Sequence, residues 1–254
     1  MVTCMRILVT FAVDWEFKPW ARLRRFRKAR DGAKIFQTRI AESDVVVVVT
    51  GVGPINALRS VRAATDEAPD LCIASGLAGG LKHDYRPGDI LVARATCSET
   101  GNEAFESDRR LLEVAVKYGA TAVNRFISAE RVVRTAKRKS ALHPTADAVD
   151  MESFTVMKEM SALGVPCVAI RCVADSAEME VPCDFERALD ASGHIRIIPV
   201  LGQVACDPRQ AWPLARFGVR SSRAASTLAR FLDRYVAQSV EQEERMDLSV
   251  QQSG

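Results

Sequence analysis

The chain has 254 residues, of which 48% are hydrophobic and 26% are charged. This composition is typical of a globular protein with a full hydrophobic core, and it excludes disordered, collagen-like and small disulfide-rich proteins. The 35 basic residues exceed the 32 acidic ones too slightly to predict a nucleic-acid partner. We expect one domain over residues 1–240 and a flexible tail over residues 241–254.

The seven cysteines indicate a reducing compartment. Their number is odd, they form no C-x-x-C pair, and several lie in apolar segments where a thiol packs as a small hydrophobic group. The three histidines lack the spacing of metal ligands. We find neither a secretory signal nor the ~20 consecutive apolar residues of a membrane-spanning helix. We therefore expect a cytoplasmic protein without a metal ion or another cofactor.

Predicted strands and helices alternate from the N-terminus onward. Met5–Val13 is a short apolar strand, and Glu16–Arg30 has apolar residues at helical spacing. The five consecutive valines of Asp44–Thr50 favour a parallel strand that is buried on both faces. Pro54 suits the first position of a helix that continues through Asn56–Thr65.

The same alternation continues to the C-terminus. The later predicted strands are Asp70–Ser75, Ile90–Ala95 and Val165–Val173, and the later predicted helices are Glu106–Tyr118, Asp150–Leu163 and Trp212–Gln238. This order predicts an α/β fold, a three-layer sandwich with a mainly parallel or mixed central sheet flanked by helices.

Three carboxylates follow predicted strands or begin a helix, where ligands of such sheets bind. Asp175 comes directly after a buried strand, where partial desolvation would raise its pKa and suit it to general acid catalysis. Glu16 follows the first strand, and Glu152 begins a helix. Each has a structural alternative: Asp175 as a turn cap, Glu16 in the first turn of its helix, and Glu152 near a helix N-terminus, worth ~0.3–1 kcal/mol.

Two glycine-rich segments and a basic cluster have less specific interpretations. The segment 51–54 matches neither a dinucleotide-binding motif nor a phosphate loop, so a flexible turn explains it equally well. The segment 76–80 has more glycine than a turn requires, which predicts a break in the strand where a ligand can approach the main chain. Basic residues from Arg22 to Arg30 form either a solvent-facing surface or, with Trp15 and Trp20, a surface for a membrane or an acidic ligand.

Four segments together resemble the nucleoside phosphorylase and nucleosidase superfamily. They are VTGVGPINA, SGLAGGLKHDYRPGDILVA, AVDMES and AIRCVADSAE, and the similarity covers residues 5 to 185. The segment AVDWEF is similar to the methylthioadenosine/S-adenosylhomocysteine nucleosidase branch, which carries a glutamate at the position of Glu16. SGLAGGL and RPGD, with RVV and AVDMES, look most like the hopanoid-associated phosphorylase branch, whose proposed substrate is an adenosylated hopane.

The resemblance implies a mechanism for cleaving an N-glycosidic bond, which places positive charge on the ribose and negative charge on the purine. Asp175 would protonate N7 of the purine, and Glu16 would activate the attacking water. Glu152 would accept hydrogen bonds from the ribose hydroxyls, Met151 would contact the sugar and Arg171 would help to position the water. The other substrate contacts implied are Val13, Leu77, Gly79 and Val133.

The resemblance leaves the nucleophile open. Leu77 stands where many members carry Ser or Thr, whose hydroxyl assists oxyanion binding in phosphorylases, and it therefore favours water. We expect a nucleosidase that releases adenine from a 5′-substituted adenosine, with a lipid nucleoside as one such substrate and a membrane surface as its source. The alternatives are a phosphate-dependent purine nucleoside phosphorylase that recruits Arg22, Arg24 or Arg25, and a non-catalytic nucleoside-binding protein. The resemblance also implies a homo-oligomer.

Overall fold

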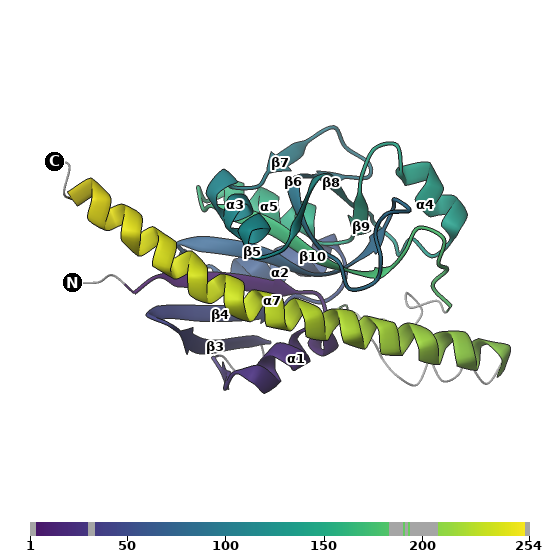
Figure 1. The fold of residues 1–254 in the computed structure, drawn as a ribbon, viewed down its shortest axis with the longest axis horizontal. Coiled ribbons are helices and arrows are strands. Elements are labelled where there is room, and N and C mark those ends of the chain that lie inside the picture. The colour runs from purple at the N-terminus through teal and green to yellow at the C-terminus, as the bar shows by residue number, and fades with distance from the viewer. Residues whose placement is uncertain (1–3, 30–33, 183–189, 191–192, 194–207, 252–254) are drawn as a thin grey trace.

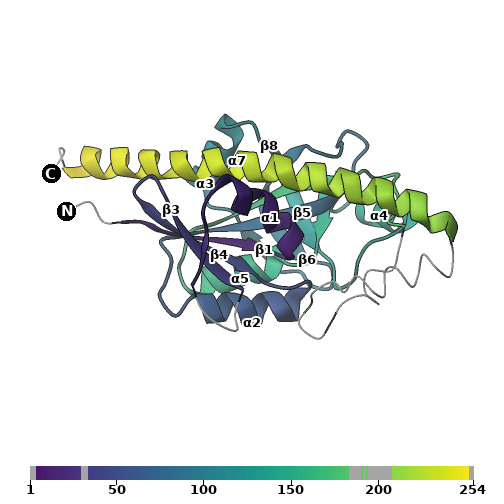
Figure 2. The same ribbon diagram turned by 90° about the horizontal axis from the view of Figure 1, so that it is seen from below.

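The computed structural model describes residues 4–29, 34–182, 190, 193 and 208–251, with side chains to residue 238. Its described strands form one mixed sheet with helices on both faces (Figures 1 and 2), so the predicted fold class is confirmed. The strands are β1 (Arg6–Phe11), β2 (Arg27–Lys28), β3 (Ile35–Ile40), β4 (Ser43–Val49), β5 (Leu71–Gly80), β6 (Ile90–Ser98), β7 (Ala104–Glu106), β8 (Thr121–Ser128), β9 (Ala148–Asp150) and β10 (Cys167–Asp175). The helices are α1 (Asp14–Leu23), α2 (Pro54–Ala64), α3 (Arg109–Lys117), α4 (Ala136–Leu142), α5 (Ser153–Ala162), the short 3₁₀ helix η2 (Pro208–Gln210) and α7 (Ala211–Gln251).

The sheet brings the carboxyl ends of four parallel strands to one edge. β1 pairs in parallel with β4 and β5, and β5 pairs in parallel with β10. β10 then pairs with β6, β6 with β8, β8 with β9, and β9 returns to β5, so these five strands form a closed ring. Side chains after β1 and at the end of β10 therefore meet near the end of β5.

The core lies on both faces of this sheet. Helices α1, α3 and α7 pack on one face, and α2 and α5 pack on the other (Figure 2). All five valines of β4 are buried, as expected for a strand that is covered on both sides. In the described part of the chain, no helix has both the length and the hydropathy needed to cross a membrane.

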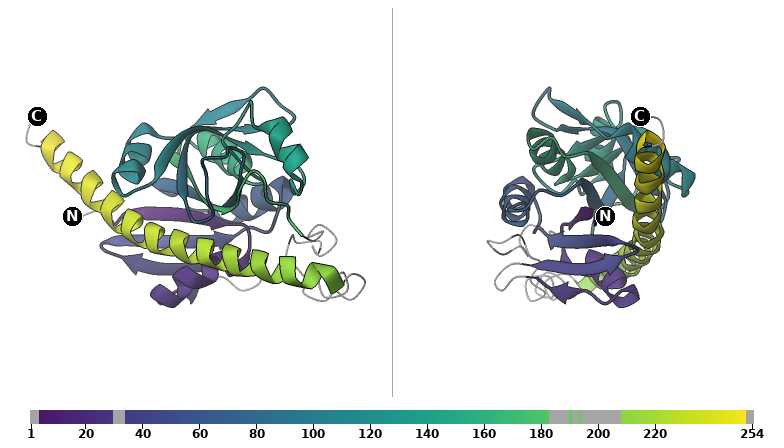
Figure 3. Two further views of the ribbon diagram at one scale, coloured as in Figure 1. Left: turned by 45° about the vertical axis from the view of Figure 1, so that its right-hand side comes forward. Right: turned by 90° about the vertical axis from the view of Figure 1, so that its left-hand side faces the viewer.

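Helix α7 runs along the length of the molecule and is held to α1 (Figure 3). The fully buried indole of Trp20 donates a hydrogen bond to Asp233 of α7 at 3.1 Å, and Arg24 donates two to the same carboxylate at 2.7 and 3.0 Å. Tyr235 donates from its hydroxyl to the carbonyl of Leu111 in α3 at 2.9 Å. These contacts fix α7 above the helix that carries Glu16.

Several predicted boundaries are wrong. The first helix ends at Leu23 instead of Arg30, because Arg24 is extended (φ −128°, ψ 149°) and the chain enters β2. The glycines of 76–80 do not break the strand, since β5 continues through them and pairs with β10 and β9. Asp150 ends β9, so the following helix begins only at Ser153. Glu106 likewise belongs to β7, and α3 starts at Arg109.

The C-terminal helix is longer than the predicted helical region. The sequence predicts helix to Gln238 and a tail from residue 241, whereas α7 continues to Gln251. The predicted boundary at residue 240 therefore falls within this helix. The elements absent from the sequence-based prediction are the strands β2, β3, β7, β8 and β9, the helix α4 and the short helix η2.

Candidate active site

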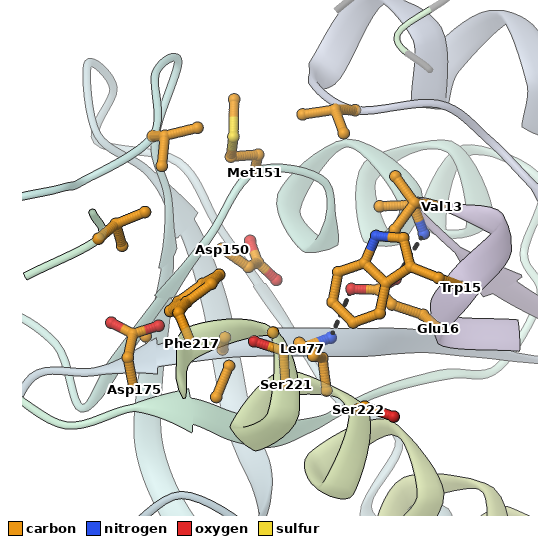
Figure 4. Close-up of a pocket in the computed structure, with 18 of the residues that line it drawn as sticks. Val13, Trp15, Glu16, Leu77, Asp150, Met151, Asp175, Phe217, Ser221 and Ser222 are labelled. Carbon is orange, nitrogen blue, oxygen red and sulfur yellow. Dashed lines mark hydrogen bonds between the residues drawn. The ribbon is translucent and has the colours of Figure 1, made fainter. Parts of the chain in front are cut away.

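A cavity of about 670 Å³ lies at the carboxyl ends of the parallel strands, beside the N-terminal part of α7 (Figure 4). Figure 4 shows Glu16 and Asp175 on different sides of this cavity, with Phe217 and Ser221 of α7 along its border. Eight of the nine predicted site residues line it: Val13, Glu16, Leu77, Gly79, Val133, Met151, Glu152 and Asp175. The ninth, Arg171, is not among the lining residues and lies behind the carboxylates.

Arg171 is the buried cation around which one side of the site is built. Its side chain is 1% exposed, and its Nε lies 2.8 Å from Oδ2 of Asp150. Its guanidinium also donates to the hydroxyl of Ser153 at 2.9 Å and to the carbonyl of Ser75 at 3.0 Å. With these partners it is held between β5 and the start of α5, so it acts on its neighbours from a fixed position.

Gly76 leaves the space that Arg171 occupies. A Cβ added at Gly76 would lie 2.2 Å from Nη1 of Arg171 and 3.3 Å from Oε2 of Glu16, and the backbone there has φ +148°. No larger residue fits at this position without moving the guanidinium. The glycine thus serves the close packing of charged side chains inside a strand.

Glu16 is buried, and both of its carboxylate oxygens are held by main-chain donors. Oε2 accepts a hydrogen bond from the N–H of Ala12 at 3.1 Å, and Oε1 accepts one from the N–H of Leu77 at 3.1 Å. Burial raises the pKa of Glu16, while the charge of Arg171 and the main-chain hydrogen bonds oppose that rise. The carboxylate is oriented by β5 and by the turn that begins α1.

Glu152 lies at the N-terminus of α5 and is anchored by one oxygen. Oε1 accepts a hydrogen bond from the N–H of Gly53 at 2.8 Å, whereas Oε2 is 3.9 Å from Nη2 of Arg171, beyond hydrogen-bond distance. Burial raises the pKa of Glu152 to about 7, with Arg171 lowering it and the nearby Asp150 and Glu16 raising it. The turn at 51–54 therefore has an identifiable role: it orients Glu152 toward the cavity.

Asp175 is paired with a lysine that the sequence-based prediction missed. Oδ2 of Asp175 is in contact with Nζ of Lys139, which lies on α4 and is completely buried. Burial raises the pKa of Asp175, and the charge and hydrogen bond of Lys139 oppose that rise. One signal in the sequence pointed to this lysine: in AKRKSAL, Lys139 is three residues from Leu142, so the two share the buried face of a short helix.

Most of the other lining residues are apolar, and the remainder include three exposed cations and two serines of α7. The apolar side chains include Trp15, Pro19, Val133, Val181, Leu214 and Phe217. Lys18 and Arg22 lie one helical turn apart on α1, and Arg131 lies beyond β8; all three are exposed and line the same cavity. Arg24 instead pairs with Asp233. Within the part of the chain that the structure describes, no group of three or more metal-ligating side chains is found.

A sequence model of the phosphorylase superfamily matches residues 6–195. The chain belongs to the phosphorylase superfamily. The matched region contains all nine predicted site residues and ends before α7 begins. Membership of the nucleoside phosphorylase and nucleosidase superfamily, which the sequence motifs predict, is therefore confirmed.

The curated relatives of this superfamily member include nucleosidases. The chain is 29% identical over 184 residues to the 5′-methylthioadenosine/S-adenosylhomocysteine nucleosidase of Haemophilus influenzae, covering 62% of this chain and 79% of that protein. It is 26% identical over 202 residues to the nucleosidase of the same name from Shewanella halifaxensis, covering 68% and 87%. The predicted enzyme class, a hydrolase of N-glycosidic bonds, agrees with these relatives.

Solved structures show the same fold for this superfamily member. A 5′-methylthioadenosine/S-adenosyl homocysteine nucleosidase from Helicobacter pylori superposes with a TM-score of 0.72 at 18% identity, over 92% of this chain and 98% of that one. The futalosine hydrolase of Helicobacter pylori superposes with a TM-score of 0.71 at 18% identity, over 92% and 98%. The hopanoid-associated branch stays a prediction.

Proposed function

We propose that this protein is a nucleosidase that hydrolyses the N-glycosidic bond of a 5′-substituted adenosine and releases adenine. The observation that carries the proposal is the presence of three buried carboxylates, Glu16, Glu152 and Asp175, in one cavity. Nucleosidases among the curated relatives support the reaction class. Three buried acidic groups around one space argue against a binding protein without activity.

Each carboxylate has a distinct task in this reaction. Glu152 accepts hydrogen bonds from ribose hydroxyls, and these bonds strengthen as the sugar becomes an oxocarbenium ion. Asp175 gives its proton to N7 of the purine while the bond between C1′ and N9 breaks. Glu16 takes a proton from the water that attacks C1′. Arg171 keeps the acidic groups near one another without entering the cavity itself.

Glu16 and Leu77 favour water over phosphate as the nucleophile. The N–H groups of Ala12 and Leu77 point to the oxygens of Glu16, which orients that carboxylate as a base. An ionised Glu16 would repel a phosphate anion. Leu77 also offers no hydroxyl for binding an oxyanion.

One observation favours a phosphorylase as the second candidate. Lys18, Arg22 and Arg131 line the cavity and supply positive charge for inorganic phosphate. Release of adenine measured with and without phosphate separates the two functions. A nucleosidase yields free ribose derivative at the same rate in both conditions, whereas a phosphate requirement with a sugar 1-phosphate product would establish the phosphorylase.

We propose further that the 5′-substituent is apolar, as in an adenosylated hopane. The apolar side chains of Val133, Val181 and Phe217 support this choice, and Trp15 and Arg22 beside the cavity suit contact with a lipid surface. A series of adenosines with increasingly apolar 5′-substituents tests the idea. We expect kcat/KM for adenine release to rise along the series; equal values for adenosine and its apolar derivatives would refute it.

A further inference from the structure

Lys139 is a buried lysine to which the proposed mechanism assigns no role. Its side chain is completely inaccessible, although α4, on which it lies, is otherwise rich in exposed basic residues. Its ammonium donates to Oδ2 of Asp175, to the carbonyl of Ser176 at 2.6 Å and to the carbonyl of Met179 at 3.0 Å. A lysine ammonium has three N–H donors, so each has an oxygen partner.

We infer that Lys139 is a positioning residue of the active site, which fixes Asp175 through Oδ2, leaves Oδ1 for the leaving purine and strengthens Asp175 as an acid. The inference rests on the proposed function, in which Asp175 protonates the base. It assigns to Lys139 a role in proton transfer that acts through Asp175 and not through contact with the substrate.

The surroundings of the ion pair hold it in one arrangement. A Cβ added at Gly79 would lie 3.3 Å from Oδ2 of Asp175 and 3.6 Å from Cε of Lys139, so β5 closes against the pair. The pairing of β10 with β5 shifts register between Val173 and Asp175, which leaves the strand end irregular. By also binding the carbonyls after Asp175, Lys139 secures this irregular end and with it the direction of the carboxyl group.

The positive charge of Lys139 lowers the proton affinity of Asp175. Burial raises the pKa of Asp175 and makes the carboxyl a weaker acid. The ammonium in contact opposes this rise, and a stronger acid gives its proton more readily to the departing base. The other charged side chains that line the cavity are Lys18, Arg22 and Arg131 from the basic set and Glu16, Asp150 and Glu152 from the acidic set. In contrast to these, Lys139 touches the Asp175 carboxylate directly.

The test compares Lys139→Met with Lys139→Arg, using 5′-methylthioadenosine and adenosine as probes. In the methionine variant we expect kcat to fall at least tenfold with little change in KM. The pH above which kcat/KM declines should move upward, since Asp175 without the ammonium keeps its proton to higher pH. Lys139→Arg retains the charge and should keep the original pH limit. Lys158→Met is the matched control, because Lys158 pairs with Glu103 at the surface.

A second measurement separates this inference from the proposed function. Infrared difference spectra against Asp175→Asn identify the protonated carboxyl band of Asp175 and follow it with pH. We expect the band to persist to higher pH in Lys139→Met than in the wild type, whether or not the protein cleaves either probe. If the methionine variant does not fold, Lys139→Gln, which keeps one donor group without charge, is titrated in its place.

The outcomes are distinct. An unshifted carboxyl titration together with an unshifted pH limit would overturn the inference, even if kcat fell, because a structural role alone would then explain the loss. An inactive wild-type protein with a shifted carboxyl titration would refute the proposed function but leave the coupling of Lys139 to Asp175 established.

Discussion

At the scale of single residues, the site depends on a glycine inside a strand. Alanine at Gly76 would place its Cβ 2.2 Å from the guanidinium of Arg171, at a φ of +148° that side chains rarely adopt. Overpacking and backbone strain each cost ~1–3 kcal/mol, so Gly76→Ala should lower the free energy of unfolding by about 2–6 kcal/mol. Urea denaturation measures the change. Gly101→Ala has no contact closer than 3.8 Å and should leave stability almost unchanged; equal effects of the two changes would contradict this account.

The burial of Glu152 predicts a pH-dependent cost in stability. Its pKa is about 7 in the folded protein and 4.5 ordinarily, so the folded state binds more protons than the unfolded state between these values. Stability contributed by the protonated group is therefore present below pH 4.5 and is lost as the pH rises through 7. Because Glu152→Gln cannot ionise, its free energy of unfolding should gain ~3 kcal/mol relative to the wild type between pH 4.5 and pH 8.

Parallel denaturation curves of the wild type and Glu152→Gln at several pH values check this expectation. Comparing the two proteins removes the contribution of Asp175, whose pKa is also raised by burial. Glu16 interacts with Glu152, so the measured difference includes the change in this interaction. The variant should lose most of its activity, because a neutral amide stabilises a cationic sugar less than a carboxylate does. A stability difference that stays constant with pH would show that Glu152 ionises as freely as in water.

At the scale of elements, Asp233 joins α7 to α1. Its carboxylate accepts hydrogen bonds from the buried indole of Trp20 and from Arg24. Asp233→Ala leaves the Trp20 N–H without this partner, and we expect the free energy of unfolding to fall by about 2 kcal/mol. Asp44→Ala is the matched control, since Asp44 pairs with Arg39 at 3.4 Å on the surface and contributes little. Thermal unfolding of both variants measures the difference. Similar losses of stability would argue against Asp233 as the link between α7 and α1.

Sequence patterns predicted the elements whose burial is continuous. The valines of β4 and the apolar residues of β10 predict strands correctly, because both faces of these strands are covered. By contrast, β3 and β8 mix buried and exposed residues, and their pairing partners decide their structure. The glycines at the end of β5 favoured a loop, yet close packing against Arg171 and Asp175 requires them within the strand.

Patterns of strands and helices in the sequence located only those candidate site residues that lie at the ends of predicted strands or at the start of a predicted helix. Glu16 and Asp175 follow β1 and complete β10, so topology alone brings them to one edge. Lys139 was not predicted, because a helix with three basic residues resembles a solvent-facing surface. Only the contact between Lys139 and Asp175 at the end of β10 shows that one of these lysines is buried.

At the scale of the whole molecule, two separate parts of the chain line the cavity. The region that matches the superfamily model ends at residue 195 and provides the three carboxylates. Helix α7 begins at Ala211 and adds Leu214 and Phe217 to the cavity. We therefore expect the superfamily region to determine the reaction and α7 to contribute to the choice of 5′-substituent.

Phe217 allows this division to be tested. Removing a phenylalanine ring from an apolar contact costs several kcal/mol in a closed core, and less at a partly exposed cavity wall. Phe217→Ala should therefore raise KM about tenfold for adenosines with an apolar 5′-substituent and leave kcat/KM for adenosine nearly unchanged. Val219→Ala is the control on the same helix, since Val219 is 53% exposed and does not line the cavity. Equal losses with both substrates would show that Phe217 supports the site as a whole and does not select the 5′-substituent.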